Sequence, residues 1–282
     1  IAEANLSEAA LDITLKPGPP ADAQAWAEKL GGRLLPTGSV RLAAHGRIED
    51  LPGFADGAWW VQDAAAALVV RLAGDIAGRS VADLCAAPGG KTAQLAAAGA
   101  RVTAVDASAG RLGRVRENLA RLHLEADIVE ADAATWSPGR DFDVVVLDAP
   151  CSATGTIRRH PDILRLKRMD DVVRMAGLQR TMLANAAGLV RPGGLLVYAT
   201  CSLEPEEGER QIAAFLAARP DFTRQPADPV TIGADPAWFT SAGELRTLPF
   251  HLPGHAPGES QAQPGMDGFF AACLRRTSES TG

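Results

Sequence analysis

The chain has 282 residues, of which 46% are hydrophobic and 22% are charged, a composition ordinary for a folded protein. Its length suits one large domain and one small one, and no apolar run approaches the roughly 20 residues that cross a bilayer, so we expect no membrane partner. The net charge of −6 means that any contact with nucleic acid must be local.

The cysteines and the first residues indicate where the protein works. Four cysteines in a chain of this length do not resemble a disulfide framework, so we predict a reducing, cytoplasmic location. The first residue is Ile1 rather than Met, and residues 1–7 do not resemble a signal peptide. We expect that upstream residues have been removed.

Residues 1–56 are predicted to form a small α/β accessory domain. Residues 11–16 alternate like a strand, residues 21–30 are typical of a helix, and residues 39–44 fit a second strand. Residues 49–57 contain the Pro and Gly of a loop that leads into the next domain.

Residues 57–277 are predicted to form the larger domain, in which strands and helices alternate. Residues 58–74, "AWWVQDAAAALVVRLAG", are predicted to form its first helix. Strands are expected at residues 81–85, 102–106, 128–130, 144–148 and 195–199, and helices at 92–98, 111–122, 170–190 and 206–219. "GFFAACLRR" (268–276) is expected to be an antiparallel last strand, and residues 278–282 a disordered tail. The alternation predicts an α/β fold with a doubly wound, mostly parallel, Rossmann-like sheet covered on both faces.

A glycine-containing loop follows the first of these strands. "VADLCAAPGGKTAQLAA" (81–97) nearly matches a phosphate-binding loop, but Cys85 stands where that motif requires its first glycine. Pro88 likewise breaks the glycine pattern of dinucleotide-binding loops. Gly89 and Gly90 remain, and they let a ligand approach the backbone at the carboxyl end of the strand.

Three acidic residues indicate which ligand this loop binds. Asp106, Asp132 and Asp148 follow or end successive strands, whose carboxyl ends meet at one crevice of an open α/β sheet. Together they would repel a pyrophosphate but suit ribose hydroxyls, an amine and a sulfonium, which favours S-adenosylmethionine over NAD or ATP. Any one of them alone could equally cap a loop or a helix.

Two cysteines stand just after neighbouring strands, and each is followed by a serine. Cys151 lies in "DAPCSATGTIRRHPD" and Cys201 in "YATCSLEPEE". A thiolate that adds to C6 of cytosine makes C5 nucleophilic enough to take a methyl group, and a second thiol can assist release. The alternative is a buried apolar role, which we favour for Cys85 and Cys273. The chain has no C-x-x-C and its histidines are scattered, so we predict no metal.

These motifs, in this order, resemble the RNA 5-methylcytosine methyltransferases of the Sun family, and most closely the bacterial 16S rRNA enzymes. The resemblance covers about residues 57–276 and includes "DLCAAPGGKT", "AVDAS", "EADA", both cysteine motifs and "GMDGFFAACLRR". It implies that Cys201 is the nucleophile, that Cys151 assists breakdown of the adduct, and that Lys91 and Asp148 touch the polar edge of cytosine. DNA enzymes use the cysteine of a Pro-Cys pair for attack instead, so Thr200-Cys201 is the distinguishing feature. The donor contacts that it implies are Cys85, Ala86, Ala87, Pro88, Gly89, Gly90, Lys91, Asp106, Asp132 and Asp148.

The chain departs from the family at two places. Bacterial members commonly begin with a helical RNA-binding domain like the antitermination factor NusB, and nothing here matches it, so we expect that domain to be among the residues removed. Residues 206–209 read Glu-Glu-Gly-Glu where the family often has Asn in third place, and we expect the chemistry to be intact.

Basic residues after the first cysteine motif predict the RNA contacts. Between residues 158 and 180 there are seven lysines and arginines against three aspartates. We predict phosphate contacts for Arg158, Arg159, Lys167 and Arg168. The alternative is a solvated helix face of mixed charge.

The sequence therefore predicts an enzyme that transfers a methyl group from S-adenosylmethionine to cytosine C5 in RNA, with 16S rRNA as the expected substrate. The motifs do not separate rRNA from tRNA, and they leave the target nucleotide and the oligomeric state open. A different class of function is a non-catalytic RNA-binding or ribosome assembly factor, against which the intact cysteines and acids argue.

Overall fold

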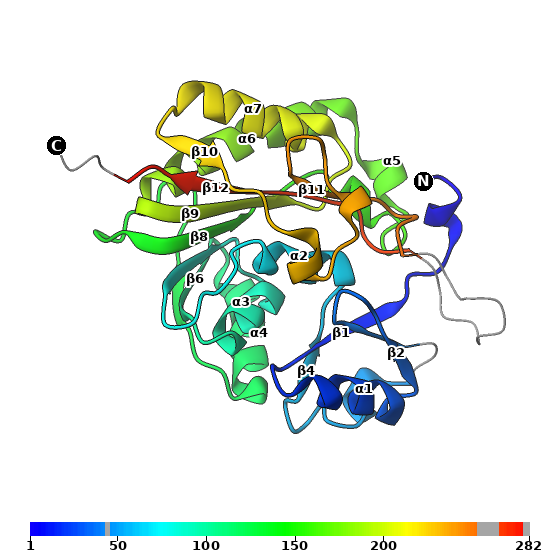
Figure 1. The fold of residues 1–282 in the computed structure, drawn as a ribbon. Coiled ribbons are helices and arrows are strands. Elements are labelled where there is room, and N and C mark those ends of the chain that lie inside the picture. Colours follow the sequence, from blue (N-terminus) through cyan, green and yellow to red (C-terminus); the bar gives the residue numbers. More distant parts are fainter. Residues whose placement is uncertain (43–45, 253–264, 279–282) are drawn as a thin grey trace.

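The computed structural model describes residues 1–42, 46–252 and 265–278, and in it a small sheet lies beside a large one (Figure 1). Most of the predicted tail, and residues 43 and 44 of the second expected strand, lie outside these described residues. Among the described helices, none has the length and apolar character that a membrane crossing requires.

The small sheet has four antiparallel strands in the order β2-β3-β1-β4. Its elements are β1 (Leu11–Leu15), α1 (Pro20–Lys29), β2 (Gly32–Leu34), β3 (Val40–Leu42) and β4 (Trp59–Val61). The first strand and the helix confirm the predicted pattern, whereas β2 is too short to give a period in the sequence. One 3-10 turn, η1 (Ala4–Leu6), precedes this unit, and another, η2 (Ile48–Asp50), lies between β3 and β4.

The predicted helix over residues 58–74 is wrong in its first part. Trp59 and Trp60 belong to β4, which pairs with β1, and both indoles are buried. Bulky aromatic residues favour a strand, and Asp63 then caps α2 (Ala64–Arg71) by accepting the Ala65 amide at 2.8 Å. The small sheet therefore takes its fourth strand from beyond residue 56.

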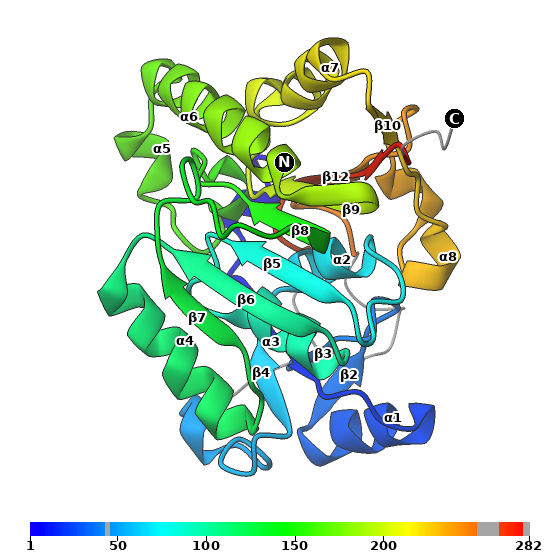
Figure 2. The same ribbon diagram turned by 90° about the vertical axis from the view of Figure 1, so that its left-hand side faces the viewer.

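The large sheet has the strand order β10-β12-β9-β8-β5-β6-β7, with β11 paired to β12 (Figure 2). Five strands are mutually parallel: β5 (Ser80–Leu84), β6 (Arg101–Asp106), β7 (Asp127–Glu130), β8 (Phe142–Asp148) and β9 (Val190–Thr200). β12 (Phe269–Arg276) runs antiparallel to them, and β10 (Phe222–Arg224) and β11 (Leu245–Thr247) each pair antiparallel with β12. This confirms the doubly wound sheet with an antiparallel last strand.

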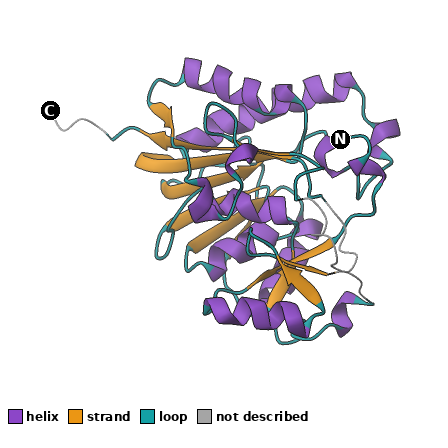
Figure 3. Cartoon of the chain, turned by 45° about the vertical axis from the view of Figure 1, so that its right-hand side comes forward, coloured by secondary structure: helices purple, strands orange, loops and turns teal. Residues whose placement is uncertain are grey.

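Helices cover both faces of the large sheet (Figure 3). On one face lie α2, α3 (Gly90–Ala97), α4 (Ala109–Leu122) and α8 (Pro229–Ile232), and on the other lie α6 (Met169–Gly188) and α7 (Glu209–Ala218). The remaining short elements are η3 (Thr154–Thr156), α5 (Ile163–Leu166), η4 (Pro205–Glu207) and η5 (Pro236–Trp238).

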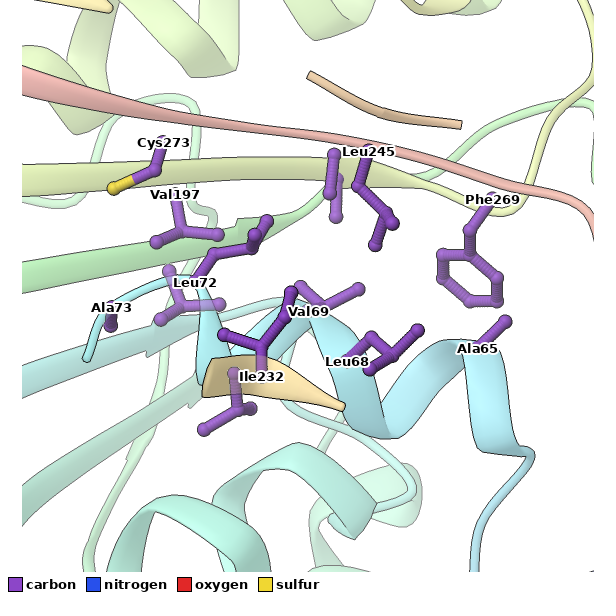
Figure 4. Close-up of a cluster of buried hydrophobic side chains, with 14 of the residues drawn as sticks. Ala65, Leu68, Val69, Leu72, Ala73, Val197, Ile232, Leu245, Phe269 and Cys273 are labelled. Carbon is purple, nitrogen blue, oxygen red and sulfur yellow. The ribbon is translucent and has the colours of Figure 1, made fainter. Parts of the chain in front are cut away.

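The core is built where α2 packs on the sheet. Figure 4 shows Leu68 and Val69 of α2 directed toward the strands that carry Val197 and Leu245. Cys273 of β12 belongs to the same buried cluster, which confirms its predicted apolar role. With both faces of the sheet packed, the ligand-accessible edge is the one where the parallel strands end.

Candidate active site

The loop between β5 and α3 is shaped by two residues with left-handed backbone. Cys85 has a φ of 64° and Gly89 a φ of 105°. At Gly89 an added Cβ would also lie 3.3 Å from Val115, so both conformation and space favour glycine. The Ala87 amide donates to Asp106 at 3.2 Å, which fixes the loop against the end of β6.

This loop forms one wall of a pocket of about 360 Å³. Seven of the predicted donor contacts line the pocket: Cys85, Ala86, Ala87, Pro88, Gly90, Lys91 and Asp148. The pocket is also lined by Asp63, Arg159, Asp267 and Phe269. The fold thus brings most of the predicted loop to one cavity, at the point between β5 and β8 where strand order reverses.

Asp106 and Asp132 lie close by, but neither lines the pocket. Asp106 is 1% exposed, and its Oδ1 accepts hydrogen bonds from the Ser108 amide (3.0 Å) and from Arg111 (2.7 Å). Asp132 is exposed and accepts the Ala134 amide at 2.9 Å, the loop-capping contact expected of an isolated aspartate.

Lys91 and Asp148 form an ion pair within the pocket, with Nζ 2.7 Å from Oδ2. The side chains are only 11% and 29% exposed. Burial lowers the pKa of Lys91, but Asp148, together with Asp83 and Cys201, outweighs burial, so the net shift of the pKa is upward. The pocket therefore holds a lysine that keeps its proton.

Asp83 is a site residue that the sequence reasoning missed. It is 0% exposed, it accepts a hydrogen bond from Thr92 Oγ1 at 2.6 Å, and burial raises its pKa to about 7. The available signal was a carboxylate between apolar residues in the strand segment "VADL" (81–84).

The sulfur atoms of Cys151 and Cys201 lie 3.4 Å apart. Both residues are half-buried and neither forms a disulfide. The hydrogen bond with Cys201, burial, and the nearby charge of Glu207 raise the pKa of Cys151 well above its ordinary value. Burial and three aspartates raise the pKa of Cys85 to about 12, which agrees with a backbone role for that residue.

The buried carboxylate of Glu207 joins the two cysteine loops. Ser152 donates to it from its amide (2.9 Å) and from its hydroxyl, and Ser202 donates from its hydroxyl at 2.6 Å. The sequence had shown two Cys-Ser pairs without a reason for the serines. Glu207 supplies the reason, because both serines bind the same acid.

The predicted RNA contacts fall in two different environments. The Arg158 side chain is 1% exposed and lies between Asp63 and Asp267, at 3.8 and 3.5 Å. Arg159 is 26% exposed and pairs with the same two acids. A guanidinium held inward by carboxylates does not suit contact with a surface phosphate. The other two predicted contacts lie at the corner between α5 and α6, where Arg168 is exposed and Lys167 is half-buried.

The sequence model of the 16S rRNA methyltransferase RsmB/F family matches residues 75–275, which are most of the chain. The chain belongs to this family. Membership confirms the resemblance that the motifs indicate. Among the described residues, no group of three or more His, Cys, Asp or Glu side chains is arranged to hold a metal ion.

Relatives in the RsmB/F family share the sequence over a large part of the chain. Ribosomal RNA small subunit methyltransferase B from Vibrio cholerae is 44% identical over 236 residues, which are 81% of this chain and 49% of the relative. The enzyme of the same name from Klebsiella pneumoniae is 48% identical over 200 residues, which are 68% of this chain and 46% of the relative. The chain thus spans about half the length of these relatives.

Solved structures share the fold. A methyltransferase homologue protein from Pyrococcus horikoshii is 27% identical, with a TM-score of 0.76 over 98% of this chain and 89% of that one. The structure of NSun6 from Pyrococcus horikoshii with SFG is 26% identical, with a TM-score of 0.67 over 83% of this chain and 57% of that one.

Proposed function

We propose that the protein transfers a methyl group from S-adenosylmethionine to C5 of a cytosine in RNA, with 16S rRNA as the substrate. The observation that carries the proposal is the pair of sulfur atoms 3.4 Å apart, of which that of Cys201 lies within electrostatic range of Lys91 in the pocket lined by the glycine-containing loop. Membership of the RsmB/F family supports the same substrate class.

The pocket residues fit the proposed methyl donor. Gly89 and Gly90 leave the backbone of the loop open to a ligand, and Asp83, Asp106 and Asp148 make the surroundings acidic. An acidic pocket suits a sulfonium and ribose hydroxyls better than a phosphate. The structure of NSun6 was solved with SFG, an analogue of this donor, which supports the same cofactor here. When bound, S-adenosylmethionine supplies an electrophilic methyl group.

Each cysteine has a distinct role in the proposed reaction. The Cys201 thiolate forms a bond to C6 of cytosine, and the electron pair displaced toward C5 makes that carbon the methyl acceptor. Water then takes the C5 proton, the electron pair left behind re-forms the C5–C6 double bond, and the bond between sulfur and C6 breaks, which frees the Cys201 thiolate. Cys151 keeps its proton and lies 3.4 Å from the departing sulfur, so it assists this release by donating a hydrogen bond to that sulfur.

The ion pair of Lys91 with Asp148 is placed to orient the base. Both residues line the pocket, and their ammonium and carboxylate offer a donor and an acceptor to the polar edge of cytosine. Because the pair is mostly buried, it selects a base with complementary groups more sharply than an exposed pair would.

We place the RNA-facing surface at the corner between α5 and α6. Arg165 and Arg168 are exposed there and Lys167 is half-buried, while Leu164 and Leu166 are 69% and 67% exposed. Cationic side chains contact phosphates, and exposed apolar ones can pack on unstacked bases. The segment before this corner lines the pocket with Thr156, Arg159 and His160. The corner therefore follows a pocket-lining segment directly in the chain.

Substitution of each cysteine tests the proposed function. In purified protein given S-adenosylmethionine and 16S rRNA, Cys201→Ala is expected to abolish methyl transfer. Cys151→Ala is expected to accumulate a protein–RNA adduct that migrates slowly on a denaturing gel. Transfer at the wild-type rate by Cys201→Ala would refute the assignment of the nucleophile, and mapping of the methylated position would separate rRNA from tRNA as the substrate.

A further inference from the structure

Glu207 has no solvent exposure, and four hydrogen-bond donor groups surround its carboxylate. They are the Ser152 amide and hydroxyl, the Ser202 hydroxyl and the Gln179 side-chain amide. A buried carboxylate is stable only when such donors replace water. All of these donors lie beside the two cysteine loops, so the burial of this acid is tied to the geometry of the reacting sulfurs.

The contacts of Glu207 bracket Cys201 on both sides. Its carboxylate accepts from Ser202, and its backbone carbonyl accepts from Thr200 Oγ1 at 3.2 Å. The same carbonyl accepts the Tyr198 hydroxyl at 2.8 Å. The end of β9 is thus held at the residues just before and just after the proposed nucleophile.

Cys151 is bracketed in the same way. Ser152, which follows it, donates to Glu207, and Pro150, which precedes it, accepts from Gln179 at 2.9 Å. Gln179 also donates to Glu207 at 3.0 Å. Glu207 is therefore the common point through which two loops fifty residues apart are held in register.

The charges around the two sulfurs differ. Cys151 lies 3.4 Å from Cys201, and the carboxylate of Glu207 and the phenol of Tyr198 are within electrostatic range of it. Cys201 also has the ammonium of Lys91 within electrostatic range. Negative charge beside Cys151 disfavours the thiolate of that residue.

We propose that Glu207 is a positioning residue that holds the two sulfur atoms together through Ser152 and Ser202 and, by its charge, reserves the thiolate for Cys201. Glu207 does not line the pocket. Its contacts with the loops that carry Cys151 and Cys201 explain why an acid is needed at this position. The inference rests on the proposed function for its catalytic meaning, but its effect on the thiols is measurable without RNA.

Glu207→Gln keeps the shape of the side chain and removes its charge. Alkylation by iodoacetamide, followed across pH for each cysteine by peptide mass spectrometry, reads the two thiols separately. We expect the midpoint for Cys151 to fall by about one pH unit or more, so that its alkylation at pH 8 becomes ~10-fold faster. We expect kcat to fall ~100-fold, with the KM for S-adenosylmethionine unchanged, because the pocket keeps its lining.

Glu206→Gln is the matched control. It removes the same charge from the neighbouring position, but Glu206 pairs with Arg210 at the surface and does not contact either serine. It should match the wild type in both measurements. A Cys151 midpoint that is the same in the Glu206 and Glu207 variants would overturn the role of the charge, and an equal kcat would overturn the positioning role.

Two serine variants keep the test decisive if Glu207→Gln does not fold. Ser152→Ala and Ser202→Ala each remove one hydroxyl donor and leave the carboxylate in place. Each should lower kcat ~10-fold without lowering the Cys151 midpoint, and wild-type kcat in both would refute the inference. If the wild type fails to methylate RNA but the midpoint still falls in Glu207→Gln, the proposed function fails and the effect on the thiols stands.

Discussion

The carbonyl oxygen of Gly155 accepts a hydrogen bond of 2.8 Å from the amide of Gly268. The Gly155 amide donates in turn to the Cys201 carbonyl at 3.0 Å. The loop after Cys151 is therefore attached both to the end of β9 and to the residue before β12, and Gly155 is where three segments of the site meet.

Gly155→Ala is expected to destabilise the protein and to reduce methyl transfer. A Cβ there would lie 1.9 Å from the Gly268 carbonyl oxygen and 2.9 Å from that of Cys201, so the backbone must shift. We expect a loss of about 1–3 kcal/mol in the free energy of unfolding, measured by urea denaturation. Gly177→Ala is the control, because no atom lies near its added methyl in α6 and alanine favours a helix. A Gly155 variant as stable and as active as the wild type would contradict this account.

Much of the fold could be predicted because its signals are periodic. Five apolar strands with helices between them identify the large sheet, and the acids at strand ends locate the crevice. Short elements such as β2 and β10 carry no period, and the start of β4 looked helical because it runs directly into α2.

Charge partners were harder to predict than motifs. Arg158 stood in a basic stretch, but Asp63 and Asp267, which hold it inward, lie about a hundred residues away on either side. Glu207 was visible only as part of an acidic run. Its role depends on its burial, which the fold creates and which cannot be predicted from the neighbouring residues in the sequence.

Asp106→Asn is expected to weaken binding of S-adenosylmethionine. Asp106 does not line the pocket, but its carboxylate holds the donor loop by accepting the Ala87 amide at 3.2 Å. A hydrogen bond to a charged group contributes about 1.5–3 kcal/mol, so loss of this charge is expected to lower the affinity ~10- to 100-fold. Isothermal titration calorimetry measures the change. Asp127→Asn, at the start of the neighbouring β7, removes an acid from the opposite end of the sheet and should bind as the wild type does. Equal affinities of the two variants would argue against a donor role for Asp106.

Asp83 is expected to make the stability of the protein depend on pH. Its pKa is about 7 in the folded protein because of burial, against 3.8 as its ordinary value. Between these values the folded state holds a proton that the unfolded state has lost, so stability falls as pH rises from about 4 to 7 and then levels off. The slope is at most about 1.4 kcal/mol per pH unit. Urea denaturation between pH 4.5 and 8 should show the wild type losing stability relative to Asp83→Asn across this window, and parallel curves would rule out the raised pKa.

The salt dependence of RNA binding tests the corner between α5 and α6. Each phosphate contact by a lysine or arginine releases counterions from the RNA. The slope of log affinity against log salt concentration therefore becomes shallower by about 0.7–0.9 for each contact that is removed. The double variant of Lys167→Ala with Arg168→Ala is expected to lower the slope by about 1.4–1.8, measured by filter binding to a 16S rRNA fragment. Arg114→Ala with Arg116→Ala removes two exposed charges from α4 and should leave the slope unchanged. If the α4 pair changes the slope and the corner pair does not, RNA approaches the protein across α4, and the RNA-facing surface proposed at α5 and α6 is misplaced.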